Sequence, residues 1–191
     1  MLKKLLCIVA LIVFTATLAS AAGYKNPRVE METSLGKITI ELFEKEAPIS
    51  VKNFLAYVQS GYYSGTTFHR VIPGFMIQGG GLTANLTPKP GNLPPIKNEA
   101  DNGLKNDRGT LSMARSGDPN SATSQFFINV AGNSSLNRPN PDGFGYAVFG
   151  KVVEGMDVAD KIVSTPQVRK NSVFQNVPVE TVTIKAVKLL K

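Results

Sequence analysis

The chain has 191 residues, of which 42% are hydrophobic, which is enough for one well-packed domain but not for two. Its formal net charge of +7 is spread along the sequence, so no basic run predicts a nucleic-acid surface, and the lack of tryptophan disfavours a stacking platform for single strands. One cysteine and one histidine argue against thiol catalysis and against a zinc site with the usual ligands, so we expect neither a metal nor a cofactor.

The first 21 residues have the three-part pattern of a secretory signal peptide. Two lysines precede an apolar run from Leu5 to Leu18, and small residues follow, with cleavage expected after Ala21. The apolar run is shorter than the roughly 20 residues that cross a bilayer as a helix. The expected layout is a signal peptide at 1–21, a flexible lead at 22–27 and one domain at 28–191, without stable membrane insertion after cleavage.

The domain is predicted to begin with a hairpin and a helix. Val29–Met31 and Lys37–Leu42 alternate apolar and polar residues on either side of a turn at Ser34–Gly36, as in a hairpin with one buried face. Apolar residues at helical spacing follow Pro48, which suits a first helical turn, and Gly61 ends the pattern. The single apolar stripe predicts that this helix packs against a sheet.

Further along the chain, short apolar segments alternate with loops rich in glycine, proline, asparagine and aspartate. The predicted strands are Thr66–Ile72, Phe75–Gln78, Thr110–Ala114, Gln125–Val130 and Tyr146–Phe149. A second helix is predicted at Gly155–Val163 and a closing strand at Glu180–Leu189. Many short strands with two helices predict a mainly β fold, a closed or nearly closed barrel, because closure removes exposed sheet edges. A two-sheet sandwich is the alternative.

The segment Phe68–Gly80 places one fixed cation and one amide among apolar residues. Its pattern predicts two strands joined by a Pro-Gly turn, which would bring Arg70 and Gln78 close together. A permanently charged guanidinium with several donors, set beside apolar side chains, is typical of a binding site. The alternative is that Arg70 is a solvated strand residue and Gly79–Gly81 an ordinary turn.

Together with Ser124–Phe127, this segment resembles the active-site signature of the cyclophilins, a family of peptidyl-prolyl cis/trans isomerases. The resemblance continues through Gly109–Ala114 and Val148–Val152, and it covers roughly Arg28 to Leu190. It implies a closed eight-stranded antiparallel β-barrel capped by two α-helices. The run Gly145–Phe149 resembles the bacterial secreted or periplasmic branch of that family.

The resemblance also implies a role for particular residues. Arg70 would be the catalytic guanidinium, and Gln78 would orient Arg70 or the peptide. Phe75, Met76, Phe127 and Leu136 would line a proline pocket, Ala114, the backbone of Arg115 and Gln125 would hold the flanking peptide, and Tyr146 would offer an aromatic wall and a hydroxyl.

Three positions depart from the familiar eukaryotic pattern. Ser135 stands where many members have tryptophan, Arg115 where they have asparagine, and Tyr146 where they have histidine. Loss of the indole donor is expected to weaken cyclosporin binding more than isomerisation. The loop from Asn133 to Phe144 is also longer than in compact members.

The reaction that the resemblance implies needs no nucleophile, metal or base. Rotation about an X-Pro bond is slow because amide resonance raises a barrier of roughly 18 to 20 kcal/mol. A donor aimed at the prolyl nitrogen in the twisted transition state would lower it, and Arg70 is the candidate donor. A serine hydrolase would need His69 as its base, yet no Gly-x-Ser-x-Gly elbow is present, and a packed or surface strand position explains His69 better.

The expected function is therefore a periplasmic or secreted isomerase that acts, as a monomer, on proline-containing unfolded or folding polypeptides, with no nucleic-acid partner. Two alternatives remain open: a proline-peptide binding or chaperone module without turnover, and a serine hydrolase. The presence of Arg70 with Gln78 and Phe127 favours the isomerase, because a pure binder could dispense with the guanidinium.

Overall fold

The computed structural model describes residues 25–190 of the chain. The signal peptide expected at 1–21 and residues 22–24 of the expected lead lie outside the described residues. Within the described part, no helix is both long enough and apolar enough to span a membrane.

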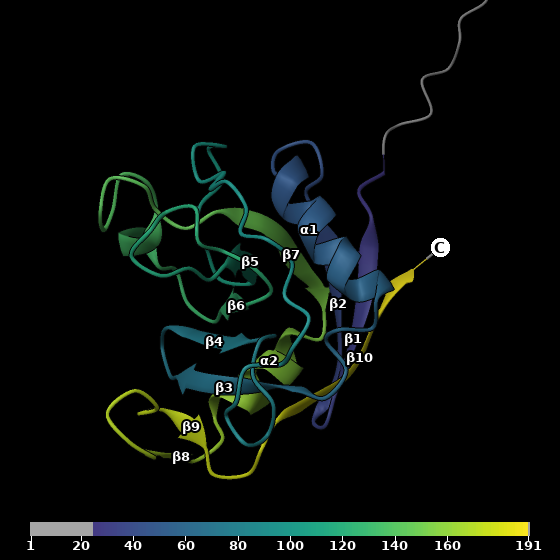
Figure 1. Cartoon of the computed structure of the whole chain (residues 1–191), viewed down its shortest axis with the longest axis vertical. Helices are drawn as coiled ribbons and strands as arrows, with labels where there is room; N and C mark the ends of the chain where they lie inside the picture. The colour runs from purple at the N-terminus through teal and green to yellow at the C-terminus, as the bar shows by residue number, and fades with distance from the viewer. Residues whose placement is uncertain (1–24, 191) are drawn as a thin grey trace, which may run out of the picture.

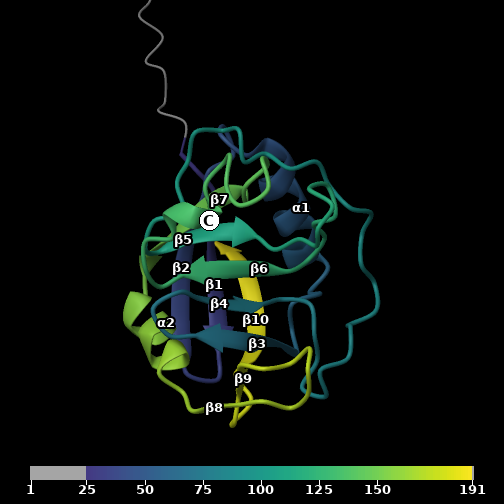
Figure 2. The ribbon, with the colours of Figure 1, turned by 90° about the vertical axis from the view of Figure 1, so that its left-hand side faces the viewer.

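Eight strands close into an antiparallel barrel, in which neighbours follow the order β1-β10-β3-β4-β6-β5-β7-β2 (Figures 1 and 2). They are β1 (Arg28–Thr33), β2 (Gly36–Leu42), β3 (Thr66–Ile72), β4 (Met76–Gly79), β5 (Thr110–Met113), β6 (Phe126–Asn129), β7 (Val148–Glu154) and β10 (Thr183–Leu190). The sheet closes because β1 pairs with both β2 and β10. The predicted barrel is confirmed, and the two-sheet sandwich is wrong.

The predicted strand at Tyr146–Phe149 differs most from the structure, since β7 runs from Val148 to Glu154. The first three residues of β7 are buried, whereas Lys151, Val153 and Glu154 are exposed. The apolar run in the sequence therefore ends halfway along this strand. The structure also contains a two-stranded sheet outside the barrel, β8 (Gln167–Val168) with β9 (Val177–Pro178), which the sequence analysis did not predict.

The two predicted helices are present and cover different parts of the barrel (Figure 2). Helix α1 (Pro48–Gln59) packs against β7 and β10, and α2 (Met156–Val163) packs against β2, β3 and β4. The residue before α1 offers no side-chain cap, and a distant carboxylate, Glu99, supplies one. Glu99 accepts hydrogen bonds from the backbone N–H groups of Ile49 and Ser50, at 3.0 and 2.7 Å, where the helix dipole favours negative charge.

An aromatic cluster joins α1 to the barrel. The ring centroid of Phe54 on α1 lies 5.0 Å from that of Tyr63, 5.7 Å from that of Phe126 and 5.3 Å from that of Phe149. Such contacts stabilise beyond the area they bury. Because successive strand residues point to opposite faces, the inward Phe126 directs the next residue, Phe127, to the outer wall of the barrel.

Candidate active site

Arg70 and Gln78 lie opposite each other on neighbouring strands. β3 and β4 are antiparallel, and their register pairs Arg70 with Gln78. Arg70 Nη1 donates to Gln78 Oε1 at 3.3 Å, and no carboxylate among the described residues pairs with this exposed guanidinium. The expected proximity of the two side chains is confirmed, and a full positive charge remains available to a ligand.

Gln125 extends this pair into a row of amides. Gln78 Nε2 donates to Gln125 Oε1 at 3.0 Å, and the backbone carbonyl of Gln125 accepts from the N–H of Ala114 at 3.0 Å. Gly81 makes room for the row, since a Cβ at this position would overlap Gln125 Cγ and lie 2.8 Å from Cδ. The turn at 79–81 therefore does more than reverse the chain, because one of its glycines is needed for the position of Gln125.

A cavity of about 180 Å³ opens beside Arg70 on the outer wall of the barrel. Nine of the ten site residues named from the sequence line it: Arg70, Phe75, Met76, Gln78, Ala114, Arg115, Phe127, Leu136 and Tyr146. The tenth, Gln125, contacts it through Gln78. Phe127 and Met76 are only 4% and 2% exposed, so the deep part of the cavity is apolar. Its size suits one side chain rather than a large ligand.

Another wall of the cavity comes from Leu136, in the long loop at 133–144, and from Tyr146, which follows that loop. Leu136 ends a short 3₁₀ helix (Ser134–Leu136), and its carbonyl accepts from the N–H of Tyr146 at 2.9 Å. The Tyr146 ring meets Phe127 edge to face, with centroids 5.8 Å apart. Asn133 Nδ2 donates to the carbonyl of Phe75 at 2.9 Å. These contacts attach the loop to the residues beneath the cavity.

The side chain of Arg115 fixes the segment that contributes this wall, through contacts with Asp142 and Gly145. It is only 3% exposed, donates to the Asp142 carboxylate at 2.7 and 2.9 Å, and donates to the Gly145 carbonyl at 3.0 and 3.1 Å. The hydrogen bond from Arg115 lowers the pKa of the Asp142 carboxyl below its usual value. The family resemblance implied a role only for the backbone of Arg115; its side chain, in addition, fixes the loop.

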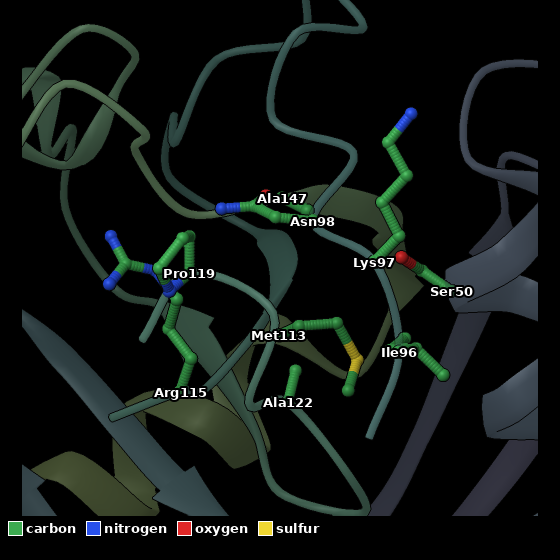
Figure 3. A pocket seen from close by; sticks show the side chains of 9 residues that line it. All are labelled: Ser50, Ile96, Lys97, Asn98, Met113, Arg115, Pro119, Ala122 and Ala147. Carbon is green, nitrogen blue, oxygen red and sulfur yellow. The ribbon is translucent and has the colours of Figure 1, made fainter. Parts of the chain in front are cut away.

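Arg115 also lines a second pocket (Figure 3). In Figure 3, Arg115 stands next to Pro119, and the side chain of Met113 extends toward Ile96. The pocket offers only about 10 Å³, room for roughly one water molecule. It is therefore a packing gap next to Arg115 and too small for a peptide.

A groove of about 330 Å³ leaves the 180 Å³ cavity in the direction of Ser121. Its lining includes Ala114, Arg115 and Gln125, the residues that the resemblance assigned to the flanking peptide. The geometry thus offers a continuous path for an extended chain past the cavity.

His69, next to Arg70 on β3, is buried and packed rather than set up as a base. It is 7% exposed, and within residues 25–190 its Nδ1 is the one buried side-chain nitrogen or oxygen that lacks a hydrogen-bond partner. Burial lowers the pKa of His69 to about 4, so the imidazole is neutral near pH 7. Without a group that orients Nδ1, the geometry gives no support to a serine hydrolase.

The fold and the cleft together define a cyclophilin-type barrel. A sequence model described as "Cyclophilin type peptidyl-prolyl cis-trans isomerase/CLD" matches residues 28–189. Peptidyl-prolyl cis-trans isomerase A of Dickeya dadantii is 52% identical over 192 residues and covers 100% of both chains, and a peptidyl-prolyl cis-trans isomerase of Acinetobacter baylyi is 56% identical over 178 residues, 93% of each. The chain belongs to the cyclophilin-type peptidyl-prolyl cis-trans isomerases and is an isomerase of this type.

Solved structures agree with this assignment. The cyclophilin-type isomerase of Cryptosporidium parvum superposes with a TM-score of 0.71 at 32% identity, covering 87% of this chain and 98% of that one. The same protein has also been solved in the presence of the dipeptide Ala-Pro, with a TM-score of 0.70 to this chain at 32% identity and coverage of 86% and 99%.

Sequence reasoning missed three features around Arg70 and the cavity: the contacts that hold the Arg115 side chain, the role of Gly81, and the loop at 173–176. Asp142 and Gly145 hold Arg115, and the only hint of these contacts in the sequence was the departure from asparagine at position 115. Gly81 was grouped with its neighbours as part of a turn. The loop at 173–176, which lines a groove together with Arg70, follows no periodic pattern in the sequence.

Proposed function

We propose that Arg70 catalyses rotation about X-Pro bonds by donating a hydrogen bond to the prolyl nitrogen in the transition state. The observation that carries this proposal is the exposed guanidinium beside a cavity with an apolar base, in contact with Gln78 Oε1 at 3.3 Å and without a carboxylate partner in the described chain. A neutralising partner would hold this donor away from a substrate. Gln78 instead fixes its direction and leaves its charge in place.

The chemistry follows from amide resonance. When the X-Pro bond is planar, the nitrogen lone pair is delocalised into the carbonyl and is a poor acceptor; at the twisted transition state the pair is localised on nitrogen. A donor placed there binds the transition state more tightly than either planar isomer, which is the condition for faster turnover. Each 1.36 kcal/mol of such preference accelerates the rotation about tenfold.

The apolar base of the cavity supplies the other half of the reaction, since it holds the proline ring while the rest of the peptide turns. Phe127 and Met76 form its buried base, and Phe75 and Leu136 stand at its sides. The amide row of Gln78 and Gln125 would bind the backbone next to the ring. One structure of the Cryptosporidium protein was determined in the presence of the dipeptide Ala-Pro, which supports proline-containing peptides as ligands.

We also propose that the enzyme works outside the cytoplasm, in the periplasm or after secretion, on polypeptides that are folding there. The support is the sequence pattern at residues 1–21, with its basic start, apolar run and small residues before the expected cleavage site. Uncatalysed X-Pro exchange takes tens to hundreds of seconds, so unfolded exported chains offer substrates on which catalysis matters.

The decisive assay measures isomerisation of a short Ala-Pro peptide by the wild type, Arg70→Ala and Arg70→Lys. We expect kcat/KM to fall by about 100-fold in Arg70→Ala, the usual cost of removing one transition-state donor. Arg70→Lys keeps the charge without the planar fork and should recover only part of the rate. Arg28→Ala, which breaks an exposed Arg28–Glu41 ion pair away from the cavity, is the matched control and should act like wild type. Binding of the peptide by an inactive wild type would instead indicate a binding module.

The intact mass of native protein from its host tests the location. A mass equal to that of the chain starting at Ala22 would agree with removal of a signal peptide. A mass that includes residues 1–21 would contradict it, because the segment would then be retained.

A further inference from the structure

A second groove of about 330 Å³, separate from the one that leads toward Ser121, borders Arg70, and Tyr146 is not part of its lining. Arg70, Gln78 and Gln125 form one side, and the loop between β8 and β9 contributes the other side with Val173, Phe174, Gln175 and Asn176. His69 and Leu82 complete the lining. The groove and the 180 Å³ cavity therefore share Arg70 and Gln78 as a common border.

The loop is fixed in place by its own hydrogen bonds. Asn171 Oδ1 accepts from the N–H groups of Val173 and Phe174 at 2.9 and 2.8 Å, and the N–H of Lys170 donates to the carbonyl of Phe174 at 2.8 Å. Figures 1 and 2 both place the β8–β9 sheet beside β3. The position of the loop next to Arg70 is secured by the N–H of Val71, which donates to the carbonyl of Asn176 at 2.9 Å.

Among residues 25–190, Val173 is the most exposed large apolar side chain, at 78%. Single exposed apolar residues are common, and alone they indicate nothing. This one, however, stands on an ordered loop at the edge of a groove that continues into a substrate cleft. Together with Phe174 and Leu82 it offers an apolar surface, and the neighbouring amides of Gln78, Gln125 and Gln175 can hydrogen-bond a peptide backbone.

We propose that this groove binds an apolar side chain of the substrate polypeptide while its X-Pro bond lies at Arg70. The apolar residue stands either before or after the proline in the sequence of the substrate. Because the groove and the cavity share Arg70 and Gln78, and an extended chain advances about 3.3 Å per residue, the bound side chain belongs to a residue close to the proline in sequence. The substrate class is thus narrowed to polypeptides that carry an apolar residue near the proline. This inference rests on the proposed role of Arg70, because the groove would bind the same polypeptide whose X-Pro bond is isomerised at Arg70.

Isomerisation of matched peptides tests the proposal. A short Ala-Pro peptide is compared with peptides extended by three residues before or after it, each extension containing either one leucine or only glycine. In wild type, kcat/KM for the leucine version of one extension should exceed its glycine version by about tenfold, as is usual for one side chain in an apolar pocket. Val173→Asp should reduce this ratio to about one. Val179→Asp, at another exposed valine outside the groove, is the control and should keep the wild-type ratio.

A second measurement uses wild type alone, so it does not depend on whether Val173→Asp folds. In ¹⁵N-labelled wild type, the amide signals of Val173 and Phe174 should shift on addition of the extended leucine peptide and not of the short peptide. Ratios near one for both extensions in wild type, or a ratio retained in Val173→Asp, would overturn the groove proposal. Failure of wild type to isomerise even the short peptide would count against the role of Arg70 instead, so the two failures are distinguishable.

Discussion

The guanidinium carbon of Arg115 lies 4.4 Å from the centroid of the Tyr146 ring. This cation–π contact adds to the hydrogen bonds from Arg115 to Asp142 and Gly145, so one buried side chain fixes both the ring that walls the cavity and the backbone that leads into it. The aromatic wall therefore depends on an arginine that need not touch the substrate through its side chain.

Arg115→Met tests this dependence. The substitution keeps much of the apolar length and removes the charge and the donors, so Tyr146 and its loop lose their support. We expect KM for a short Ala-Pro peptide to rise by about threefold to tenfold with kcat nearly unchanged, because uniform binding is lost and Arg70 is untouched. Arg28→Met is a matched control that breaks another arginine–carboxylate pair. Equal KM values in the two variants would show that the wall does not need Arg115.

Gly81 offers a test of the amide row. In Gly81→Ala the added methyl group would displace Gln125, and Gln78 would lose its acceptor at 3.0 Å. Since Gln78 also contacts Arg70, we expect kcat/KM to fall by about tenfold, a loss of roughly 1.4 kcal/mol of transition-state binding. Gly117→Ala, where a Cβ would meet nothing within 4 Å, is the control. An unchanged rate in Gly81→Ala would indicate that the position of Gln125 is unimportant.

The sequence predicted those parts of the fold in which one periodic pattern determines one element. Met31 and Ile38 are opposite each other in the register of the first hairpin and are fully buried, as alternation requires. Pro48 starts α1 and Gly61, with a φ of +68°, follows its end. The choice between barrel and sandwich depends on the pairing of β1 with β10, a contact between distant segments on which local periodicity has no bearing.

Some residues of the candidate site could be placed from local sequence patterns, and others could not. Arg70 and Gln78 could be placed together from the residues, because a hairpin brings its two strands into register. Leu136 and Tyr146 lie in a long irregular loop, so only the resemblance to a family could place them at the cavity. Val173 and Phe174 belong to a connection between two-residue strands, which has neither a period nor a matching motif.

Cyclosporin should inhibit this enzyme poorly. Ser135, where many relatives carry a tryptophan, is exposed in the 3₁₀ helix beside Leu136 and cannot provide an indole N–H. We expect no inhibition at nanomolar concentrations in the Ala-Pro assay and a gain of at least about tenfold in Ser135→Trp, the order of one good hydrogen bond with its apolar contact. Ser134→Trp, at the neighbouring exposed serine, should bring no such gain. Nanomolar inhibition of wild type would contradict the prediction.

His69 should make the fold less stable as the pH falls. The pKa of His69 is lowered to about 4, below the 6.5 of an exposed histidine, because burial disfavours its charged form. Between these two values the unfolded chain takes up a proton that the folded chain does not, so the free energy of unfolding decreases from pH 6.5 down to about pH 4. The two values correspond to a loss of about 2 kcal/mol at pH 5 relative to pH 7.5.

Urea unfolding of wild type and His69→Gln at pH 7.5 and pH 5 measures this loss. Carboxylates also begin to titrate near pH 5, but they do so in both proteins, so the difference between the two pH dependences isolates His69. Gln cannot ionise, and we therefore expect the variant to lose about 2 kcal/mol less than wild type on acidification. Parallel losses in the two proteins would mean that His69 takes up its proton equally in the folded and unfolded chains. The imidazole would then be hydrated in solution, and its buried position on β3 would not govern its charge.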